Sequence, residues 1–276
     1  MISPETRRFA LAVAVLMLLG MHHSVRAQQN QKSMSLTVEQ AKEIVAGKNV
    51  ELLQSVTELS VEVAQVLSQY SKGDLRLYRV RAITPEVARA LAPATKKGVT
   101  LSLGLTTITP EVARELAAHT RGMLALDALR EISVEVAREL AKFRGKLTLN
   151  GLRTLSREVA IELAKHRSKF TLFGLTEISD EAAEALSHHR STMLLNGLTK
   201  LTSVPLTITM LKSNDGFLNL SKVEALSDEV VQILAEYQGS RPIRLTGLTE
   251  LSEANAARLR ANEKIVLLSK FQKAGK

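Results

Sequence analysis

The stretch KLTLNGLRTLSREVAIELA, from Lys146 to Ala164, contains the pattern that most of the chain repeats. Leu147 and Leu149 alternate with Thr148, which predicts a short strand with both leucines on one face. The following Asn150-Gly151 predicts a bend, because both residues tolerate positive φ. The first half of this stretch therefore favours a strand that ends in a turn.

The second half of the stretch has the features of a short amphipathic helix. Ser156 is a candidate N-cap, since its hydroxyl can accept from a free backbone N–H, and Glu158 in the first turn suits the positive end of the helix dipole. An apolar stripe at helical spacing follows, formed by Val159, Ala160, Leu163 and Ala164. Such a unit cannot bury its own apolar face, so we expect a copy on each side of it.

Ten copies align on the cap residue, at spacings of 23 to 25 residues. The cap positions are Thr37, Ser60, Thr84, Thr109, Ser133, Ser156, Ser179, Ser203, Ser227 and Ser252. The seventh residue after the cap is always a large aliphatic one: Ile44, Leu67, Leu91, Leu116, Leu140, Leu163, Leu186, Met210, Leu234 and Leu259. This regularity predicts an α/β repeat architecture rather than two ordinary domains.

The repeat L-x-L-x-x-L-x-x-L-S-x-E-V-A-x-x-L-A resembles leucine-rich repeats, and it is most similar to the bacterial surface class that reads I-x-I-P-x-x-V-x-x-I-G-x-x-A-F-x-x-C. The resemblance spans Leu36 to Leu268. It implies an α/β solenoid of ten strand–turn–helix units, with a parallel sheet on one face and helices on the other. It also implies a non-enzymatic binding scaffold and carries over no catalytic residue. Leu152 and its equivalents replace the asparagine of the family, so its asparagine ladder is not expected.

The domain organisation follows from the limits of the repeats. Residues 1–27 resemble a secretory signal peptide, with Arg7 and Arg8 before an apolar run and a small-residue cleavage pattern that ends at Ala27. An uncleaved N-terminal anchor is the alternative, and it would be the chain's one contact with a membrane. We expect a flexible leader at 28–35, the solenoid at 36–268 and a basic, frayed tail at 269–276. The chain would then be exported to the periplasm, the cell surface or the medium.

One copy is irregular. The segment from Leu201 to Leu211 lacks the glutamate and both alanines of the repeat and carries Pro205 in its first turn. Its β-branched residues disfavour a helix. The segment is either a decayed repeat or a break that presents Lys212–Gly216 as a binding loop.

Several kinds of site lack support in the sequence. There is no cysteine and no tryptophan, and no G-x-S-x-G, G-x-G-x-x-G or P-loop motif occurs, so we expect no enzyme and no cofactor. Three of the histidines, His119, His166 and His189, stand ten residues after their caps, where other copies have Tyr or Phe. This indicates ring packing, while a metal shared by His166 and His189 lacks a third ligand. His188 lies outside that column.

Two surfaces are candidate binding sites. The outward strand residues, predicted to form an exposed face, are Arg76, Ser102, Thr148, Thr171, Asn219 and Arg244. Basic residues at the turn from helix to strand are predicted to align as a positive edge: Lys96, Lys97, Lys142, Arg144, Lys146, Lys165, Arg167, Lys169 and Arg190. With a formal net charge of +9, the edge suits an anionic polymer, and the strand face suits a protein. Nucleic acid is the weaker candidate because aromatic residues are only 3% of the chain. The alternatives are a solubilising edge and a structural, self-associating envelope component; the sequence leaves the oligomeric state open.

Overall fold

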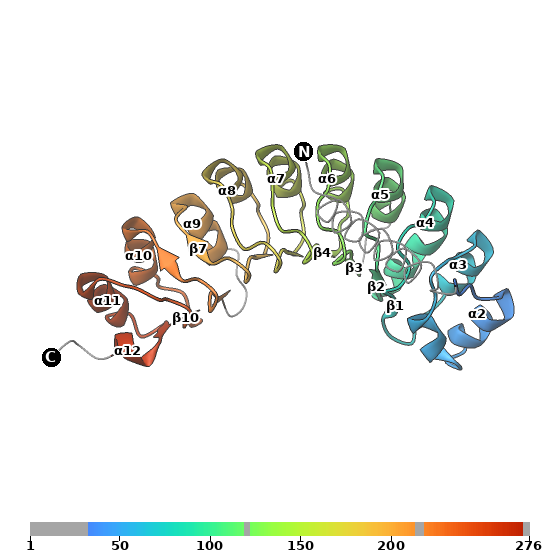
Figure 1. Ribbon diagram of the computed structural model, residues 1–276, viewed down its shortest axis with the longest axis horizontal. Coiled ribbons are helices and arrows are strands. Elements are labelled where there is room, and N and C mark those ends of the chain that lie inside the picture. The colour runs from blue at the N-terminus through green and yellow to red at the C-terminus, as the bar shows by residue number, and fades with distance from the viewer. Residues whose placement is uncertain (1–32, 119–121, 213–217, 273–276) are drawn as a thin grey trace, which may run out of the picture. The chain divides into compact units, whose positions relative to one another are not determined.

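The computed structural model describes residues 33–118, 122–212 and 218–272. The chain divides into two units, Met1–Met34 and Ser35–Lys276. The first unit lies almost wholly outside the described residues, and so does the predicted signal peptide. The second unit holds the helices and strands of Figure 1.

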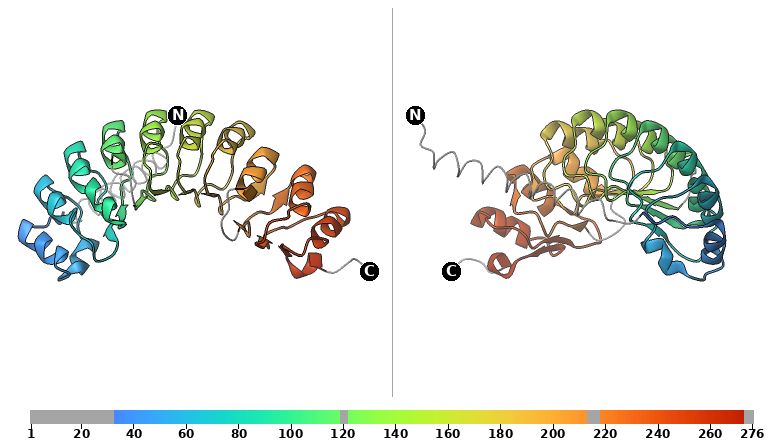
Figure 2. Two further views of the ribbon diagram at one scale, coloured as in Figure 1. Left: turned by 180° about the vertical axis from the view of Figure 1, so that it is seen from behind. Right: turned by 45° about the vertical axis from the view of Figure 1, so that its right-hand side comes forward.

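The helices of the second unit follow one another at nearly constant intervals. The α-helices are α2 (Val38–Val45), α3 (Val61–Leu67), α4 (Pro85–Leu91), α5 (Pro110–Ala117), α6 (Val134–Leu140), α7 (Arg157–Ala164), α8 (Asp180–Ser187), α9 (Val204–Lys212), α10 (Asp228–Ala235), α11 (Glu253–Arg260) and α12 (Ser269–Gln272). Two 3₁₀ helices, η1 (Val50–Gln54) and η2 (Ala92–Lys97), follow α2 and α4. Figure 2 shows the helices along one side of the unit and the strands along the other.

The strands are short and parallel to their neighbours. They are β1 (Leu75–Leu77), β2 (Thr100–Leu103), β3 (Met123–Ala125), β4 (Lys146–Thr148), β5 (Phe170–Thr171), β6 (Met193–Leu194), β7 (Lys200–Leu201), β8 (Leu218–Asn219), β9 (Ala225–Leu226), β10 (Ile243–Leu245) and β11 (Ile265–Leu267). Strands β1 to β6 form one sheet in chain order, in which Leu75 pairs with Leu101 and Leu147 with Phe170. The predicted α/β class with a parallel sheet is confirmed.

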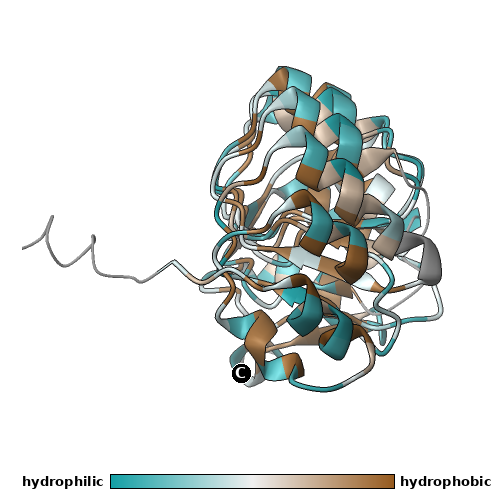
Figure 3. Ribbon diagram, turned by 90° about the vertical axis from the view of Figure 1, so that its right-hand side faces the viewer, coloured by the Kyte–Doolittle hydropathy of each residue, from teal (hydrophilic) through white to brown (hydrophobic). Residues whose placement is uncertain are grey.

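The helices begin where the cap residues predict. In each of the ten copies the cap hydroxyl accepts from the backbone N–H three residues later, and the distance at Ser156 is 3.2 Å. The aliphatic residue seven after the cap is at most 1% exposed in every copy. Hydrophilic and hydrophobic stretches accordingly alternate along the helices in Figure 3. Cap chemistry and the apolar stripe thus fix both the start of each helix and the face that it buries.

The turn after β4 forms where the sequence predicts it, but Gly151 is needed for another reason than expected. Gly151 does not adopt positive φ, which among glycines occurs at Gly47, Gly73, Gly98 and Gly122 in the described residues. Instead, a Cβ at Gly151 would lie 2.3 Å from the carbonyl oxygens of Asp127 and Leu129. The predicted bend is present at Asn150 and Gly151. Glycine is required there because the turns of successive copies pack against each other, and not because of positive φ.

The predicted single sheet is interrupted. Beside the six-stranded sheet, the described strands form a three-stranded sheet in the order β11-β10-β8 and a pair β7-β9. The break falls at the irregular copy, where α9 forms in spite of its β-branched residues and Ser203 caps it. The binding loop predicted at Lys212–Gly216 lies outside the described residues except for Lys212.

Both predicted ends of the array are more ordered than the sequence indicates. Ser35, placed in the flexible leader, forms a parallel bridge with Glu58. Ser269–Gln272, placed in the frayed tail, forms α12, and the Nζ atom of Lys270 donates to the carbonyl oxygen of Thr249 at 2.7 Å. None of the helices within the described residues has the length and apolar character needed to cross a membrane.

Candidate functional site

The predicted strand face is only partly exposed. Ser102, Thr148 and Thr171 are 4%, 7% and 3% exposed, whereas Arg76 and Arg244 are exposed and Asn219 is intermediate. The prediction of an exposed face is therefore wrong for the three small residues. Strands lie about 4.8 Å apart, so a short side chain is covered by larger neighbours in adjacent copies.

The small residues form the floor of a groove on the strand side of β1 to β6. The groove has a volume of about 290 Å³. Its lining residues come from six successive copies: Asp74, Arg76, Tyr78, Thr100, Ser102, Met123, Ala125, Asp127, Lys146, Thr148, Asn150, Lys169, Thr171, Phe173 and Leu194. Asn219 and Arg244 are not among them, because they belong to the sheet beyond the break. The structure therefore brings four of the six predicted residues together and separates two.

Aromatic side chains stand at the strand-side groove. Among the described residues, Tyr78 and Phe173 are the large apolar side chains with high exposure, at 54% and 39%. Both are the residue after the second strand leucine of their copy, a position that the sequence pattern did not single out. Exposed aromatic residues that flank a polar floor are typical of interaction surfaces.

The charges of the groove differ along its length. Asp74 Oδ2 lies 3.1 Å from Arg76 Nη2, and hydrogen bonds from Thr100 and Arg76 lower the pKa of the Asp74 carboxyl. Lys146 and Lys169 line the groove without an ion pair within the described residues. This surface offers positive charge at β4 and β5 and a compensated pair at β1.

Side-chain oxygens link successive copies at the end of the strands. Asp127 Oδ1 accepts from Asn150 N at 2.9 Å. Asn150 Oδ1 accepts from Phe173 N at 3.0 Å and from Thr171 Oγ1 at 2.8 Å. The family's asparagine ladder was not expected, and these bridges indeed start from a different position, one residue after the second strand leucine. They hold the backbone beside Phe173 in place.

The predicted basic edge divides into two parts. Lys146 and Lys169 face the strand-side groove, whereas Lys142, Arg144, Lys165, Arg167 and Arg190 line two grooves on the helix side. Lys142 and Lys165 each pair with the glutamate three residues earlier, Glu139 at 2.8 Å and Glu162 at 2.7 Å. Lys96 and Lys97 end η2, and their side chains fall outside the described residues. Of the described residues of the predicted edge, Lys146 and Lys169 therefore line another groove than the other five.

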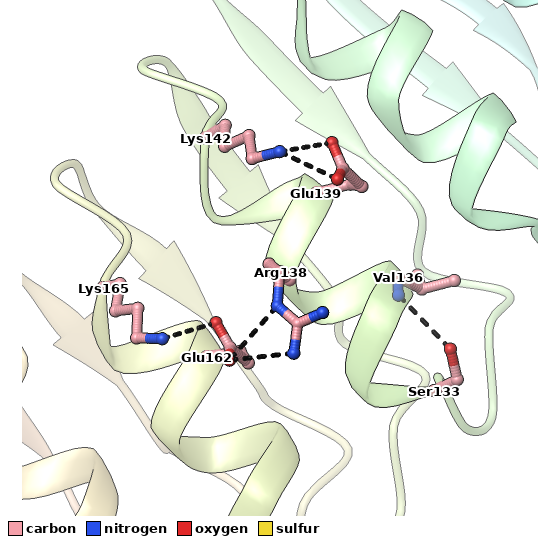
Figure 4. A network of polar contacts seen from close by, with 7 residues as sticks. All are labelled: Ser133, Val136, Arg138, Glu139, Lys142, Glu162 and Lys165. Atoms are coloured by element: carbon pink, nitrogen blue, oxygen red, sulfur yellow. Dashed lines mark hydrogen bonds and ion pairs between the residues drawn. The ribbon is translucent and has the colours of Figure 1, made fainter.

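Ion pairs between helices were missed by the sequence analysis. Arg89 pairs with Glu115 at 2.8 Å, Arg114 with Glu139 at 3.9 Å and Arg138 with Glu162 at 3.4 Å. Figure 4 shows the last of these contacts between α6 and α7. The arginine is five residues after its cap and the glutamate six after the next cap, a regularity that the sequence does contain. We call these contacts the Arg–Glu rungs.

The histidine column packs as predicted. His166 and His189 are 1% and 3% exposed, and their rings stack with centroids 6.5 Å apart. Phe170 meets His189 edge-on at 4.5 Å. Burial lowers the pKa of both imidazoles, that of His189 to about 4. His188 is exposed, and His119 lies outside the described residues. The buried rings are therefore uncharged at neutral pH.

The column of glutamates two after the cap has a local explanation. In Glu62, Glu86, Glu111, Glu135 and Glu181 the carboxyl pKa is lowered first by the backbone N–H of the same residue and then by the cap hydroxyl. A general acid would need a raised pKa instead. Among the described residues no three His, Asp or Glu side chains are grouped to hold a metal ion.

Comparisons with known proteins identify no family. No family model matches the chain, and no curated protein matches it. A solved structure described as the Rad7 and Elc1 complex in yeast aligns over 96% of this chain and 91% of that chain, with 11% identity and a TM-score of 0.34. A likeness at that TM-score supports no statement about fold or function.

Proposed function

We propose that the unit Ser35–Lys276 is a leucine-rich-repeat-like solenoid that acts as an exported, non-enzymatic scaffold and binds a protein partner on its strand side. The strands β1 to β6 in chain order and the helix caps in register support the solenoid. The residues Arg7, Arg8 and Val25–Ala27 support export.

One observation carries the binding proposal. Tyr78 and Phe173 are highly exposed and lie just after β1 and β5, at the same position of their copies. Four ladder steps separate them, or about 19 Å at the spacing of parallel strands. An extended peptide segment of about six residues covers that distance. Its apolar side chains would contact the two rings, and the polar floor between them would accept and donate hydrogen bonds.

The experiment selects peptides from a display library on the purified chain and measures their affinity. The double variant Tyr78→Ser and Phe173→Ser is expected to weaken the best binder about tenfold or more, because aromatic residues dominate binding energy at such surfaces. The matched control, Arg89→Ala on the helix side, is expected to leave the affinity unchanged. Equal affinity of the double variant and the wild type would contradict the proposal.

An anionic polymer is the second candidate partner, and Lys146 and Lys169 in the same groove favour it. Polymer binding would weaken steeply with salt, whereas binding to the aromatic residues would not. Self-association of an envelope component would instead appear as a mass that rises with concentration in sedimentation. N-terminal sequencing of the exported chain tests the cleavage after Ala27.

A further inference from the structure

A second groove lies on the helix side, between α7 and α8. Its volume is about 1180 Å³, against about 410 Å³ for the neighbouring groove between α6 and α7. Its apolar wall is formed by Ile161, Ala164 and Ala185. We refer to it as the α7–α8 groove.

The α7–α8 gap lacks an Arg–Glu rung. In the three preceding gaps an arginine five after the cap reaches a glutamate six after the next cap. In the α7–α8 gap these two positions hold Ile161 and Ala185. Replacing a long ion pair by short apolar side chains removes the atoms that cover the gap and leaves apolar surface in their place.

The two ends of the α7–α8 groove carry different charged side chains. At the carboxyl ends of the helices, Arg167 and Arg190 stand eleven residues after their caps, are exposed and form no ion pair within the described residues. At the opposite end Arg157 is also exposed and forms no ion pair within the described residues, but it shares the groove with Asp180, Glu181 and Glu184 of α8. Two arginines from successive copies therefore stand together only at one end of the groove.

A buried polar group without a partner lines the same groove. His166 is 1% exposed, and its ring nitrogens make no hydrogen bond of normal geometry within the described residues, although the backbone of Ala141, Phe143, Gly145 and Lys169 surrounds the ring. Buried polar groups are nearly always hydrogen-bonded in native proteins. The ring lies next in sequence to Arg167, on the positive side of the groove.

We propose that the α7–α8 groove binds a single-chain anionic amphiphile, with the alkyl chain along Ile161, Ala164 and Ala185 and the carboxylate or phosphate between Arg167 and Arg190. Two guanidinium groups offer paired N–H donors to such an oxyanion. The acidic wall of α8 excludes a second anion further along the groove. This site is independent of the strand-side groove.

The probe is decyl phosphate below its micelle concentration, titrated into the purified chain by calorimetry. The helices that flank the groove are each about 12 Å long, which suits a chain of that size. We expect saturable binding of one molecule per chain. Decanol is expected to bind about tenfold more weakly or worse, since it lacks the charge-assisted hydrogen bonds. Decyltrimethylammonium and inorganic phosphate are expected not to saturate. Equal binding of the cationic probe would overturn the proposal.

Two variants distinguish binding at this site from nonspecific binding of the amphiphile to the protein surface. Ile161→Arg with Ala185→Glu rebuilds the rung of the preceding gaps and is expected to abolish binding while the melting temperature is kept. Arg167→Gln with Arg190→Gln changes only exposed side chains and is expected to weaken binding about tenfold or more. Arg144→Gln, in the same column one copy earlier, is the matched control and should change nothing. Unaltered affinity in the second variant refutes the site even if the first variant fails to fold.

A final experiment with vesicles distinguishes binding of a free amphiphile from binding to a membrane surface. Vesicles that contain phosphatidylglycerol present the same anionic group within a bilayer. Saturable binding of the monomer with no cosedimentation on vesicles supports the proposal. Cosedimentation without binding of the monomer overturns it in favour of a lipid surface.

Discussion

The copies from β1 to β6 and the irregular copy around α9 follow the same repeat but are held together differently. In the regular copies, backbone ladders join every strand to the next one, and Asp127 and Asn150 add side-chain bridges. At the irregular copy the ladder from β6 stops within the described residues. Instead, β7 and β9, the strands just before α9 and α10, pair with each other, with Lys200 opposite Ala225.

The break also changes the hydrogen bonding of Asn196. This residue occupies the same position in its copy as Asn150 does two copies earlier. Asn196 Oδ1 has no hydrogen-bond partner among the described residues. The N–H group that it would meet, that of Ser221, is bonded at 3.0 Å by the side chain of Asn219 in its own copy. A repeat can therefore keep its buried core across a break while it loses the polar links between copies.

The largest predicted effect tests whether the regular copies form one cooperative structure. Leu163→Asp places a carboxylate where the leucine is 1% exposed. Burying an unpaired charge costs more than the total stability of most domains, so we expect the native melting transition of β1 to β6 to be lost. Circular dichroism on heating measures it. Leu163→Met is the control, and a native transition in the Asp variant would contradict the assigned core.

The next effect depends on pH and on the stacked histidines. An unfolded imidazole binds a proton near pH 6.5, while the buried His189 does so only near 4. The unfolded state thus binds more protons between these values, and stability falls as pH falls from 6.5 to 4 and levels off below. The shift corresponds to about 3 kcal/mol at most.

A variant of His189 separates the histidine contribution to the pH dependence of stability from that of the carboxylates, which titrate at lower pH. His189→Phe copies the ring that Phe143 supplies in the same column. Its free energy of unfolding, measured by urea titration, should lose the part of the slope between pH 6.5 and 4 that comes from His189 and keep the part that comes from His166. An unchanged slope would mean that the ring is accessible to protons in the folded chain.

The third prediction compares Asn150 with Asn196 directly. Asn150→Ala removes two hydrogen bonds and leaves Phe173 N without its acceptor, which should cost about 2 kcal/mol. Asn196→Ala should cost little, because its oxygen makes no bond with the described residues. Denaturant unfolding of both variants gives the difference. Equal losses would show that the polar links continue across the break.

The sequence predicted the features that depend on local chemistry. Ser156 was assigned as a cap and Leu163 as core because cap geometry and helical period need no knowledge of the neighbours. The burial of Thr148 was mispredicted because it depends on the height of side chains in adjacent copies. The break after β6 was mispredicted because hydrogen bonding between copies depends on how the chain returns from α9. The site residues Tyr78 and Phe173 lacked a signal, since the other copies carry no aromatic residue at that position and so no repeat pattern marks it.

The smallest predicted effect concerns the Arg–Glu rungs. They occur in the three gaps from α4 to α7 and are absent from the α7–α8 gap. Arg138 is 52% exposed at its side chain and Glu162 is 10% exposed. Solvent screens such a pair, so the coupling free energy from a double-mutant cycle of Arg138→Gln and Glu162→Gln should be about 0.5 kcal/mol.

The pair is not isolated, because Lys165 also contacts Glu162 at 2.7 Å. Both cations lower the pKa of the Glu162 carboxyl, Lys165 more than Arg138. In Arg138→Gln the Glu162 carboxylate should therefore still be stabilised by Lys165, and this remaining stabilisation should vanish when Lys165→Gln is added. Raising the salt concentration should reduce the coupling further. A coupling above about 2 kcal/mol, beyond the range for exposed pairs, would mean that the rungs bind the helices together rather than merely cover the gaps between them.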